Sequence, residues 1–305
     1  MISSKRIRLM MGELEHESTW KTDNVGTSND DQITLPLIAT GSYEFVVQWG
    51  DGLSNYIDTW NQAEVTHTYP ASGTYKVKIT GKCWGFQFNN GGDKLKILTI
   101  ERWGKDFNLG NNNSVFYGCA NLVINAKDIL DTSMMTDFYQ LFRDCAALNA
   151  DLNFNDTSNV TNHTYMLRGC VAFNGSVSKI DTTNSTTLAG MFYECNAFNQ
   201  PVSHFNTAKV DNMYALFYNC TAFNQDISNL NIESVTNVNY FLDGATSFST
   251  ANYDLFLIEI ATNQNVVDSL TFHASSTYTS GGAAEAARTD LATTDLWTIN
   301  DLGAA

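Results

Sequence analysis

The sequence predicts a mainly β fold with short helices: a β-sandwich, then a solenoid of about 25-residue repeats, then a C-terminal α/β cap. Two observations predict it. Residues 34–103 alternate between apolar and polar side chains as β-strands do, and residues 104–250 repeat with a constant period. We therefore divide the 305-residue chain into an N-terminal arm or linker (1–33), the sandwich (34–103), the solenoid (104–250) and a capping segment (251–305).

The charge balance excludes some classes of partner. The chain has 17 basic and 32 acidic residues, a formal net charge of -15. A nucleic-acid-binding protein needs a concentrated basic face, and an anionic membrane surface attracts basic residues for the same reason. No stretch approaches the roughly 20 apolar residues of a membrane span. We expect neither nucleic-acid binding nor membrane insertion.

The first 33 residues are polar and aperiodic, which indicates an arm or linker. Glu13, Glu15, His16 and Glu17 are metal-ligand types, but we interpret this charge run as a solvated tail. The basic residues near the start are not followed by the apolar run of about 7–15 residues of a signal peptide. We expect either a trimmed chain or release without such a signal, as for a phage protein freed by lysis.

Residues 34–103 read as short strands separated by Gly and Pro turns. Asp51-Gly52 is a strong tight-turn dipeptide. Downstream, Tyr75, Val77 and Ile79 alternate with polar residues, which predicts a strand with one apolar face. This pattern favours a small β-sandwich.

The same stretch contains a motif spread over about 50 residues: Trp49, Gly50, Asp51, Gly52, His67, Thr68, Tyr69, Gly73, Tyr75 and Val77. It resembles the PKD (polycystic kidney disease) domain, although Val47 stands where that family has its upstream Trp. The resemblance implies an immunoglobulin-like module for spacing or binding rather than chemistry. We interpret Asp51 as a turn residue and not as an ion ligand.

The repeats are defined by a column of cysteines spaced 26, 25, 25 and 25 residues apart, with Ala245 in the next position: Cys119, Cys145, Cys170, Cys195 and Cys220. A Leu or Phe follows each three residues later. A period of this length with Leu, Asn and Cys at fixed places is typical of a leucine-rich-repeat solenoid.

The unit "DTSNVTNHTYMLRGCVAFNGSVSKI", beginning at Asp156, resembles the BspA-type family of leucine-rich repeats. His163 replaces a Met of the family pattern, and Ile180 replaces a Trp. The resemblance implies surface-displayed adhesion or interaction proteins of bacteria, and similar arrays occur in phage virion proteins. No catalytic residues come with it.

The cysteine column is predicted to be structural. Leu188, Phe192 and Cys195 are spaced i, i+4, i+7, which predicts one face of a short helix and directs the thiol into the core. In-line thiols about 4.8 Å apart on stacked coils are poorly placed for disulfides, and no CxxC or CxxH spacing indicates a metal. A dyad of Cys170 with His163 would need an exposed thiol of lowered pKa, for which nothing in the sequence provides.

A second column holds asparagines four residues after four of the cysteines: Asn149, Asn174, Asn199 and Asn224. We expect these amides to bond turn backbone groups between coils.

Candidate binding residues stand two positions before each small core residue: Tyr117, Arg143, Arg168, Tyr193 and Tyr218, with Asp243 in the sixth repeat. Tyr and Arg are enriched at recognition hot spots, and a solenoid would present them about 5 Å apart. Tyr rings stack on sugars, so the expected partners are a host-surface glycan or protein, or neighbouring virion or surface proteins. The alternative is an ordinary solvated face.

Enzyme signatures such as GxSxG, HExxH and phosphate-binding loops are absent, and the glycine-rich "NNGGD" at 89–93 is not followed by a helix pattern. We predict no catalytic residue, metal or cofactor. The predicted function is a non-enzymatic surface-displayed binding or structural protein. Its expected place is the virion surface or extracellular space, as a phage fibre, decoration or receptor-binding component. The alternatives are a BspA-type cell-surface adhesin and an accessory module of a secreted glycoside hydrolase.

Both ends of the solenoid need covers. Residues 94–104 should join it to the sandwich through Leu95, Ile97 and Leu98. At the other end "NYDLFLIEIA" predicts an amphipathic helix with Leu255 and Ile258 against the last coil. A second helix is expected to begin near Ser280, and "LWTIN" reads as a final short strand.

Overall fold

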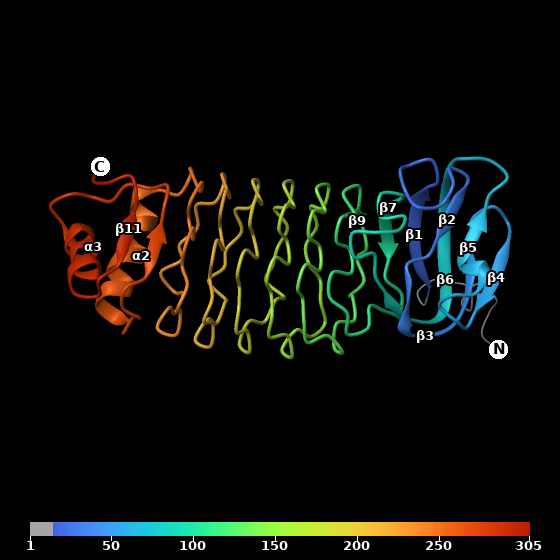
Figure 1. Ribbon diagram of the computed structural model, residues 1–305, viewed down its shortest axis with the longest axis horizontal. Helices are drawn as coiled ribbons and strands as arrows, with labels where there is room; N and C mark the ends of the chain where they lie inside the picture. Colours follow the sequence, from blue (N-terminus) through green and yellow to red (C-terminus); the bar gives the residue numbers. More distant parts are fainter. Residues whose placement is uncertain (1–14) are drawn as a thin grey trace, which may run out of the picture.

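The computed structural model describes residues 15–305 as an elongated molecule, with a β-sheet domain at one end, stacked coils in the middle and two helices at the other end (Figure 1). The strands are β1 (His16–Lys21), β2 (Gln32–Thr34), β3 (Leu37–Gln48), β4 (Ser54–Ile57), β5 (Thr66–Thr68), β6 (Thr74–Phe86), β7 (Ile97–Arg102), β8 (Phe107–Asn108), β9 (Val123–Ile124), β10 (Thr271–His273) and β11 (Thr298–Asn300). The helices are η1 (Ala63–Val65), α2 (Thr250–Asn263) and α3 (Ala283–Thr293). The expected mainly β fold with few short helices is confirmed, and no described helix is long and apolar enough to cross a membrane.

The N-terminal domain is a seven-stranded sheet in the order β4-β3-β6-β1-β7-β9, with β8 alongside β6 and a separate β2–β5 pair. The expectation of an arm over residues 1–33 is wrong for the described part, because β1 lies inside this sheet between β6 and β7. One face of β1 buries His16, Ser18 and Trp20. Two of these side chains are polar, so the strand shows no apolar alternation in the sequence.

The Asp51-Gly52 turn joins β3 to β4 as predicted, with Gly52 at φ 96°. Asp51 Oδ2 lies 2.8 Å from His67 Nε2, and the His67 ring stacks on Trp49 at 4.7 Å between centroids. The Tyr69 hydroxyl donates to the Trp49 carbonyl at 3.0 Å. These motif residues therefore lock the turn to β5, and the Asp51 carboxylate is used inside the domain.

The sheet does not end where the predicted sandwich ends. β9, which belongs to the first coil, pairs in parallel with β7. Ile97 and Ile100 are buried, while Leu95 and Leu98 are half-buried. The 94–104 segment thus continues the apolar core from the sheet into the coils.

Residues 109–249, the coil array, advance by one coil every 25 residues. Parallel bridges join Asp137 to Asn162, then Thr187, Asn212 and Asn237. Alternate amides bond to the next coil, as Phe142 N does to Met166 O at 2.9 Å. The amides between them bond three residues back, as Arg143 N does to Gln140 O at 3.2 Å. Both sets of backbone donors are therefore satisfied, as a buried core requires.

The predicted short helix before each cysteine is wrong: these residues form consecutive turns. Each coil places two residues in the left-handed region, five and one positions before the small core residue. In the third coil they are Tyr165 (φ 56°) and Gly169 (φ 73°). Left-handed residues stop α-helix propagation, although the i, i+4, i+7 residues still point into the core.

The C-terminal segment closes the array. α2 begins after Ser249, whose hydroxyl accepts from Asn252 N at 3.3 Å. The buried face of the helix holds Tyr253, Phe256, Leu257 and Ile260. Leu255, expected on that face, is instead 48% exposed, because the inward stripe follows 253, 256, 257 and 260.

The remaining cap consists of α3 and the parallel pair β10–β11. β10 continues the array through the bond from Leu242 N to His273 O at 3.0 Å. β11 is the predicted final strand. α3 begins at Ala283, with Gly282 as a cap that has no side chain to bond, so Ser280 is not its cap.

Candidate functional site

The cysteines of the repeat column are all buried and free. From the second coil on, each thiol donates to a backbone carbonyl of the preceding coil: Cys145 to Phe116 (3.1 Å), Cys170 to Phe142 (3.0 Å), Cys195 to Leu167 (3.0 Å) and Cys220 to Phe192 (2.9 Å). Burial raises the pKa of these thiols far above the ordinary value. Such thiols are poor nucleophiles and bind one coil to the next.

His163 lies in the same dry core. Its Nδ1 is 3.1 Å from Ser185 Oγ, its ring meets Phe138 edge to face, and its Nε2 has no hydrogen-bond partner among the described residues. Burial lowers the pKa of His163 to about 3. A neutral, fully covered imidazole fits a core position and not a dyad with Cys170.

The asparagine column forms a ladder on the surface of the coils. The side-chain Oδ1 atoms of Asn149, Asn174, Asn199 and Asn224 each accept the backbone N–H one coil on, at 2.9 Å in every step. The last of these donors is Ser249, the N-cap of α2. These amides hold the turns in register, as their spacing indicates.

The acidic N-terminal residues are used by the sheet. Glu13 lies outside the described residues. Lys78 Nζ approaches Glu15 at 2.6 Å, and Lys76 Nζ approaches Glu17 at 2.7 Å. Within residues 15–305, no group of three or more His, Cys, Asp or Glu side chains is placed to hold a metal ion.

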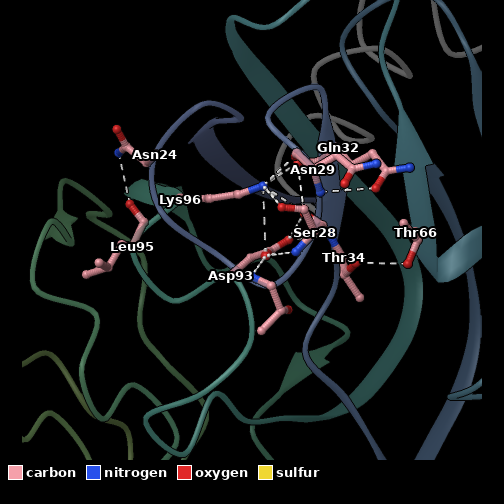
Figure 2. Close-up of polar contacts among 10 residues, drawn as sticks. Asn24, Ser28, Asn29, Gln32, Thr34, Thr66, Asp93, Leu95 and Lys96 are labelled. Carbon is pink, nitrogen blue, oxygen red and sulfur yellow. Dashed lines mark hydrogen bonds and ion pairs between the residues drawn. The ribbon is translucent and has the colours of Figure 1, made fainter.

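A buried polar cluster next to the first coil was not predicted (Figure 2). Lys96, with 0% of its side chain exposed, donates to Ser28 O, Asn29 O and Gln32 O at 2.8–3.1 Å and to Ser28 Oγ at 2.7 Å. Asp93, equally buried, accepts from the Thr27, Ser28 and Thr34 amides and from Ser28 Oγ at 2.7–3.0 Å. The two side chains clamp the loop at 27–34 onto the segment that leads into the array. The carboxylate of Asp93 and the ammonium of Lys96 therefore have their hydrogen-bond partners within the protein.

The predicted binding column is brought together on the array as one continuous stack. We call it the Tyr–Arg strip and define it as Tyr117, Arg143, Tyr165, Arg168, Tyr193, Tyr218, Tyr240 and His273. Three residues of the strip were not predicted: Tyr165 and Tyr240, which stand five positions before a small core residue, and His273 of β10. The column of Tyr165 and Tyr240 also holds Ser114, Gln140, Gly190 and Ala215, so the sequence shows no repeated aromatic residue at this position.

The first half of the strip alternates guanidinium groups and rings. Arg143 Cζ lies 4.6 Å from the Tyr117 ring centroid and 5.9 Å from that of Tyr165. Arg168 Cζ lies 5.1 Å from the Tyr165 centroid and 4.6 Å from that of Tyr193. Each arginine is therefore held between two rings by cation–π contacts.

The second half is aromatic. Tyr193 and Tyr218 stack at 4.5 Å with 19° between their planes, and Tyr240 meets Tyr218 edge to face at 6.2 Å. Tyr240 in turn stacks on His273 at 4.6 Å. Since the Tyr193 and Tyr218 faces cover one another along the array axis, the expectation that these rings stack on sugars fails for this pair. They present edges and hydroxyl groups instead.

Two tyrosines of the strip occupy strained positions. Tyr165 and Tyr240 have φ of 56° and 60°, which is uncommon for a bulky residue and costs on the order of 1 kcal/mol. Gly190, the equivalent residue one coil after Tyr165, has no such cost. A Cβ at Gly190 would lie 2.4 Å from Tyr165 Cε1, so the glycine makes room for the ring. Ser114, Gln140 and Ala215 have the same left-handed backbone at this position, so the strain comes from the turn geometry of the repeat.

The polar groups of the strip have few protein partners. Arg143 Nε has no hydrogen bond within the described chain and lies 3.5 Å from Asp144 Oδ2. Arg168 forms no ion pair with any described residue. Partial burial is the main cause that raises the pKa of Tyr193, which keeps this phenol protonated. The strip is therefore a half-buried line of hydrogen-bond donors.

Elsewhere on the first coils, a shallow groove of about 600 Å³ lies over residues 123–127, 149–153 and 176–179. It is open and lined mainly by Asn, Ser, Ala and Lys. It contains no buried titratable group aimed into it.

Fold and strip together define a repeat protein with a line of Tyr and Arg side chains on the outside of its coils and its thiols inside. The family described as "Mycoplasma protein of unknown function, DUF285" matches residues 87–182 and 136–256, which together span more than half of the chain. The chain belongs to this family. Comparison with curated proteins and with solved structures gave no match.

Proposed function

We propose that this protein is a non-enzymatic, surface-displayed binding protein and that the Tyr–Arg strip is its binding surface. The observation that carries the proposal is the strip itself: eight side chains stacked along the array, with guanidinium and phenol donors that the protein does not use. Family membership is compatible with such a role. Tyr and Arg are the side chains most enriched where binding energy concentrates.

The fold assignment is part of this proposal. We assign the coil array to the BspA-type leucine-rich-repeat solenoids, on the basis of its 25-residue step and inward cysteine column. We assign the N-terminal sheet to the PKD-like modules, on the basis of the cluster of Trp49, Asp51, His67 and Tyr69. In this arrangement the module covers one end of the solenoid and spaces it from an attachment point.

The place of display is the cell or virion surface. The family match gives no support to a phage role. We therefore favour display on the bacterial cell surface, and display on a virion is the second candidate. Antibody labelling of intact cells and of purified virions separates the two. Label on cells alone supports the adhesin, and label on virions alone supports the fibre or decoration protein.

The competing function is that of an accessory module of a glycoside hydrolase. To test for enzymatic activity, the purified protein is incubated with glycan and peptide panels, and both retained ligand and released product are measured. We expect retention without turnover. Turnover by the purified chain would contradict the non-enzymatic assignment.

A further inference from the structure

We propose that Arg143 and Arg168, with the three tyrosines around them, form an anion subsite that binds the carboxylate or sulfate groups of an acidic saccharide. The inference rests on the proposed function, because it names the ligand chemistry of the same strip. It goes further in placing the charged part of the ligand at one end of the strip.

Stacking on rings does not cover the N–H groups at the edge of a guanidinium, although in Arg143 the Nε is itself buried and the two terminal nitrogens are the donors left for a ligand. A guanidinium stacked over a ring still has its N–H donors in its own plane, where they match the two oxygens of a carboxylate or sulfate. Arg143 and Arg168 both have Cζ 4.6 Å from a ring centroid, of Tyr117 and Tyr193 respectively. Tyr165 lies between them and contacts both. The rings thus hold the terminal nitrogens of Arg143 and the guanidinium of Arg168 in fixed orientations.

Arg143 and Arg168 occupy equivalent positions on neighbouring coils, whose backbones lie about 4.8 Å apart by the spacing of parallel strands. Their guanidinium groups contact the same Tyr165 ring, and two like charges this near repel each other. Asp144 is the acidic side chain within reach of Arg143, at 3.5 Å, and Arg168 has no carboxylate partner in the described structure. An anion bound across both guanidinium groups would relieve this repulsion.

The rest of the strip favours a saccharide over a protein partner. A protein interface has an apolar core, but the faces of Tyr193 and Tyr218 are covered by each other. What remains is a row of phenol hydroxyls, and those of Tyr165, Tyr193 and Tyr218 donate to no described protein acceptor. Such a row matches the hydroxyls of a sugar chain lying along the array. The acidic residue would sit at the arginine coils and neutral residues would extend toward Tyr240.

The test is titration calorimetry of the full chain with four probes: a sulfated heparin oligosaccharide, an oligogalacturonate, a neutral malto-oligosaccharide and a poly-glutamate peptide. The two acidic saccharides distinguish sulfate from carboxylate. We expect at least one to bind more tightly than the neutral probe, and Arg168→Gln or Arg143→Gln to weaken it by about tenfold or more. Arg168→Lys keeps the charge but loses the planar fork, so it should restore little of the affinity.

Lys179→Gln is the matched control, since it removes an exposed positive charge from the groove face of the same array. It should leave the affinity unchanged, and unchanged melting of every variant shows that the fold is intact. Failure of both acidic saccharides to bind, or equal binding by Arg168→Gln, would overturn the anion subsite. Poly-glutamate binding in place of saccharide binding would overturn the saccharide assignment. Neutral-sugar binding that Tyr218→Ala removes and Arg168→Gln does not would overturn the subsite while leaving the proposed function intact.

Discussion

The thiol of Cys220 donates to the carbonyl oxygen of Phe192, 28 residues earlier, at 2.9 Å. The same contact joins each successive pair of coils from Cys145 onward. A cysteine here combines a small apolar body with a weak donor for a buried carbonyl. Thiol labelling should therefore find the five column cysteines unreactive in the folded protein and fully reactive after denaturation. Rapid native labelling of Cys170 or Cys195, or a mass deficit from disulfides, would refute this.

The packing of Tyr165 over Gly190 gives a second prediction. Gly190→Ala adds a methyl group in contact with the ring, at φ 58°, and should lower the free energy of unfolding by about 1–3 kcal/mol. Ala215 has the same left-handed backbone one coil later without a ring before it, so Ala215→Gly should change stability little. Urea denaturation measures both. Truncating the ring in Gly190→Ala/Tyr165→Ala should recover part of the loss, and a strictly additive double variant would show that the two residues are not coupled.

Two buried histidines predict a loss of stability in acid. Burial lowers the pKa of both His16 and His163 to about 3, against 6.5 for an exposed imidazole. The unfolded chain takes up these protons first as pH falls, so the stabilisation is complete above pH 6.5 and is lost between 6.5 and about 3. Each histidine should contribute a loss of about 1.4 kcal/mol per pH unit in that window.

Denaturation of the wild type and of His163→Met, each measured at about pH 7.5 and about pH 5, isolates the contribution of His163 to this pH dependence. Met213 occupies the equivalent position of a later coil, so the substitution fits the core. The wild type should lose about 2 kcal/mol more than the variant over this interval. Identical pH dependence of the two proteins would show that His163 titrates normally in the fold.

The Asp93–Lys96 cluster predicts a strong and local effect on stability. Lys96→Met removes the cation that satisfies three carbonyl groups and one hydroxyl, and leaves Asp93 as a buried charge. The free energy of unfolding should fall by about 3–5 kcal/mol. The exposed Lys105→Met serves as the control and should be neutral. A loss of under about 1 kcal/mol for Lys96→Met would mean that water replaces the ammonium without cost.

Removal of the C-terminal cap should destabilise the array. Truncation after Ser249 removes Phe256, which stacks on Phe241 at 5.7 Å, and Phe272, which also packs against it. The last coil would expose apolar rings and unpaired backbone groups. We expect aggregation or a clearly lower melting temperature by light scattering and calorimetry. A monomeric truncated chain with unchanged melting would rule out an obligatory cap.

The sequence predicted best what the repeats hold constant. The period and inward direction of the coils follow from the columns at Cys170 and Phe173, since an identical residue every 25 positions requires one environment. The turns were mistaken for helices because the left-handed positions carry residues as different as Gln140, Tyr165 and Glu194, which give no glycine signal.

Contacts that involve backbone groups or polar strand faces were not predictable. β1 buries His16 and Ser18 beside Trp20, so its pattern does not look like a strand. Lys96 is held mainly by carbonyl groups, which no side-chain pattern encodes. The five strip residues found from their column lie together, as expected of neighbours on successive coils. Their contacts with Tyr165 and Tyr240 were not predictable, because the rest of that second column holds Ser, Gln, Gly and Ala.

The most direct test of the central claim is the affinity of the wild type and of Tyr218→Ala for the tightest ligand found in a glycan and peptide panel. Tyr56→Ala is the matched control, since Tyr56 is a 54% exposed tyrosine on β4, a strand of the N-terminal sheet domain that lies outside the coil array (Figure 1). If the Tyr–Arg strip is the binding surface, Tyr218→Ala should weaken binding by about tenfold or more while Tyr56→Ala leaves it unchanged. Equal affinity of Tyr218→Ala and wild type, with both variants folded, would contradict the account.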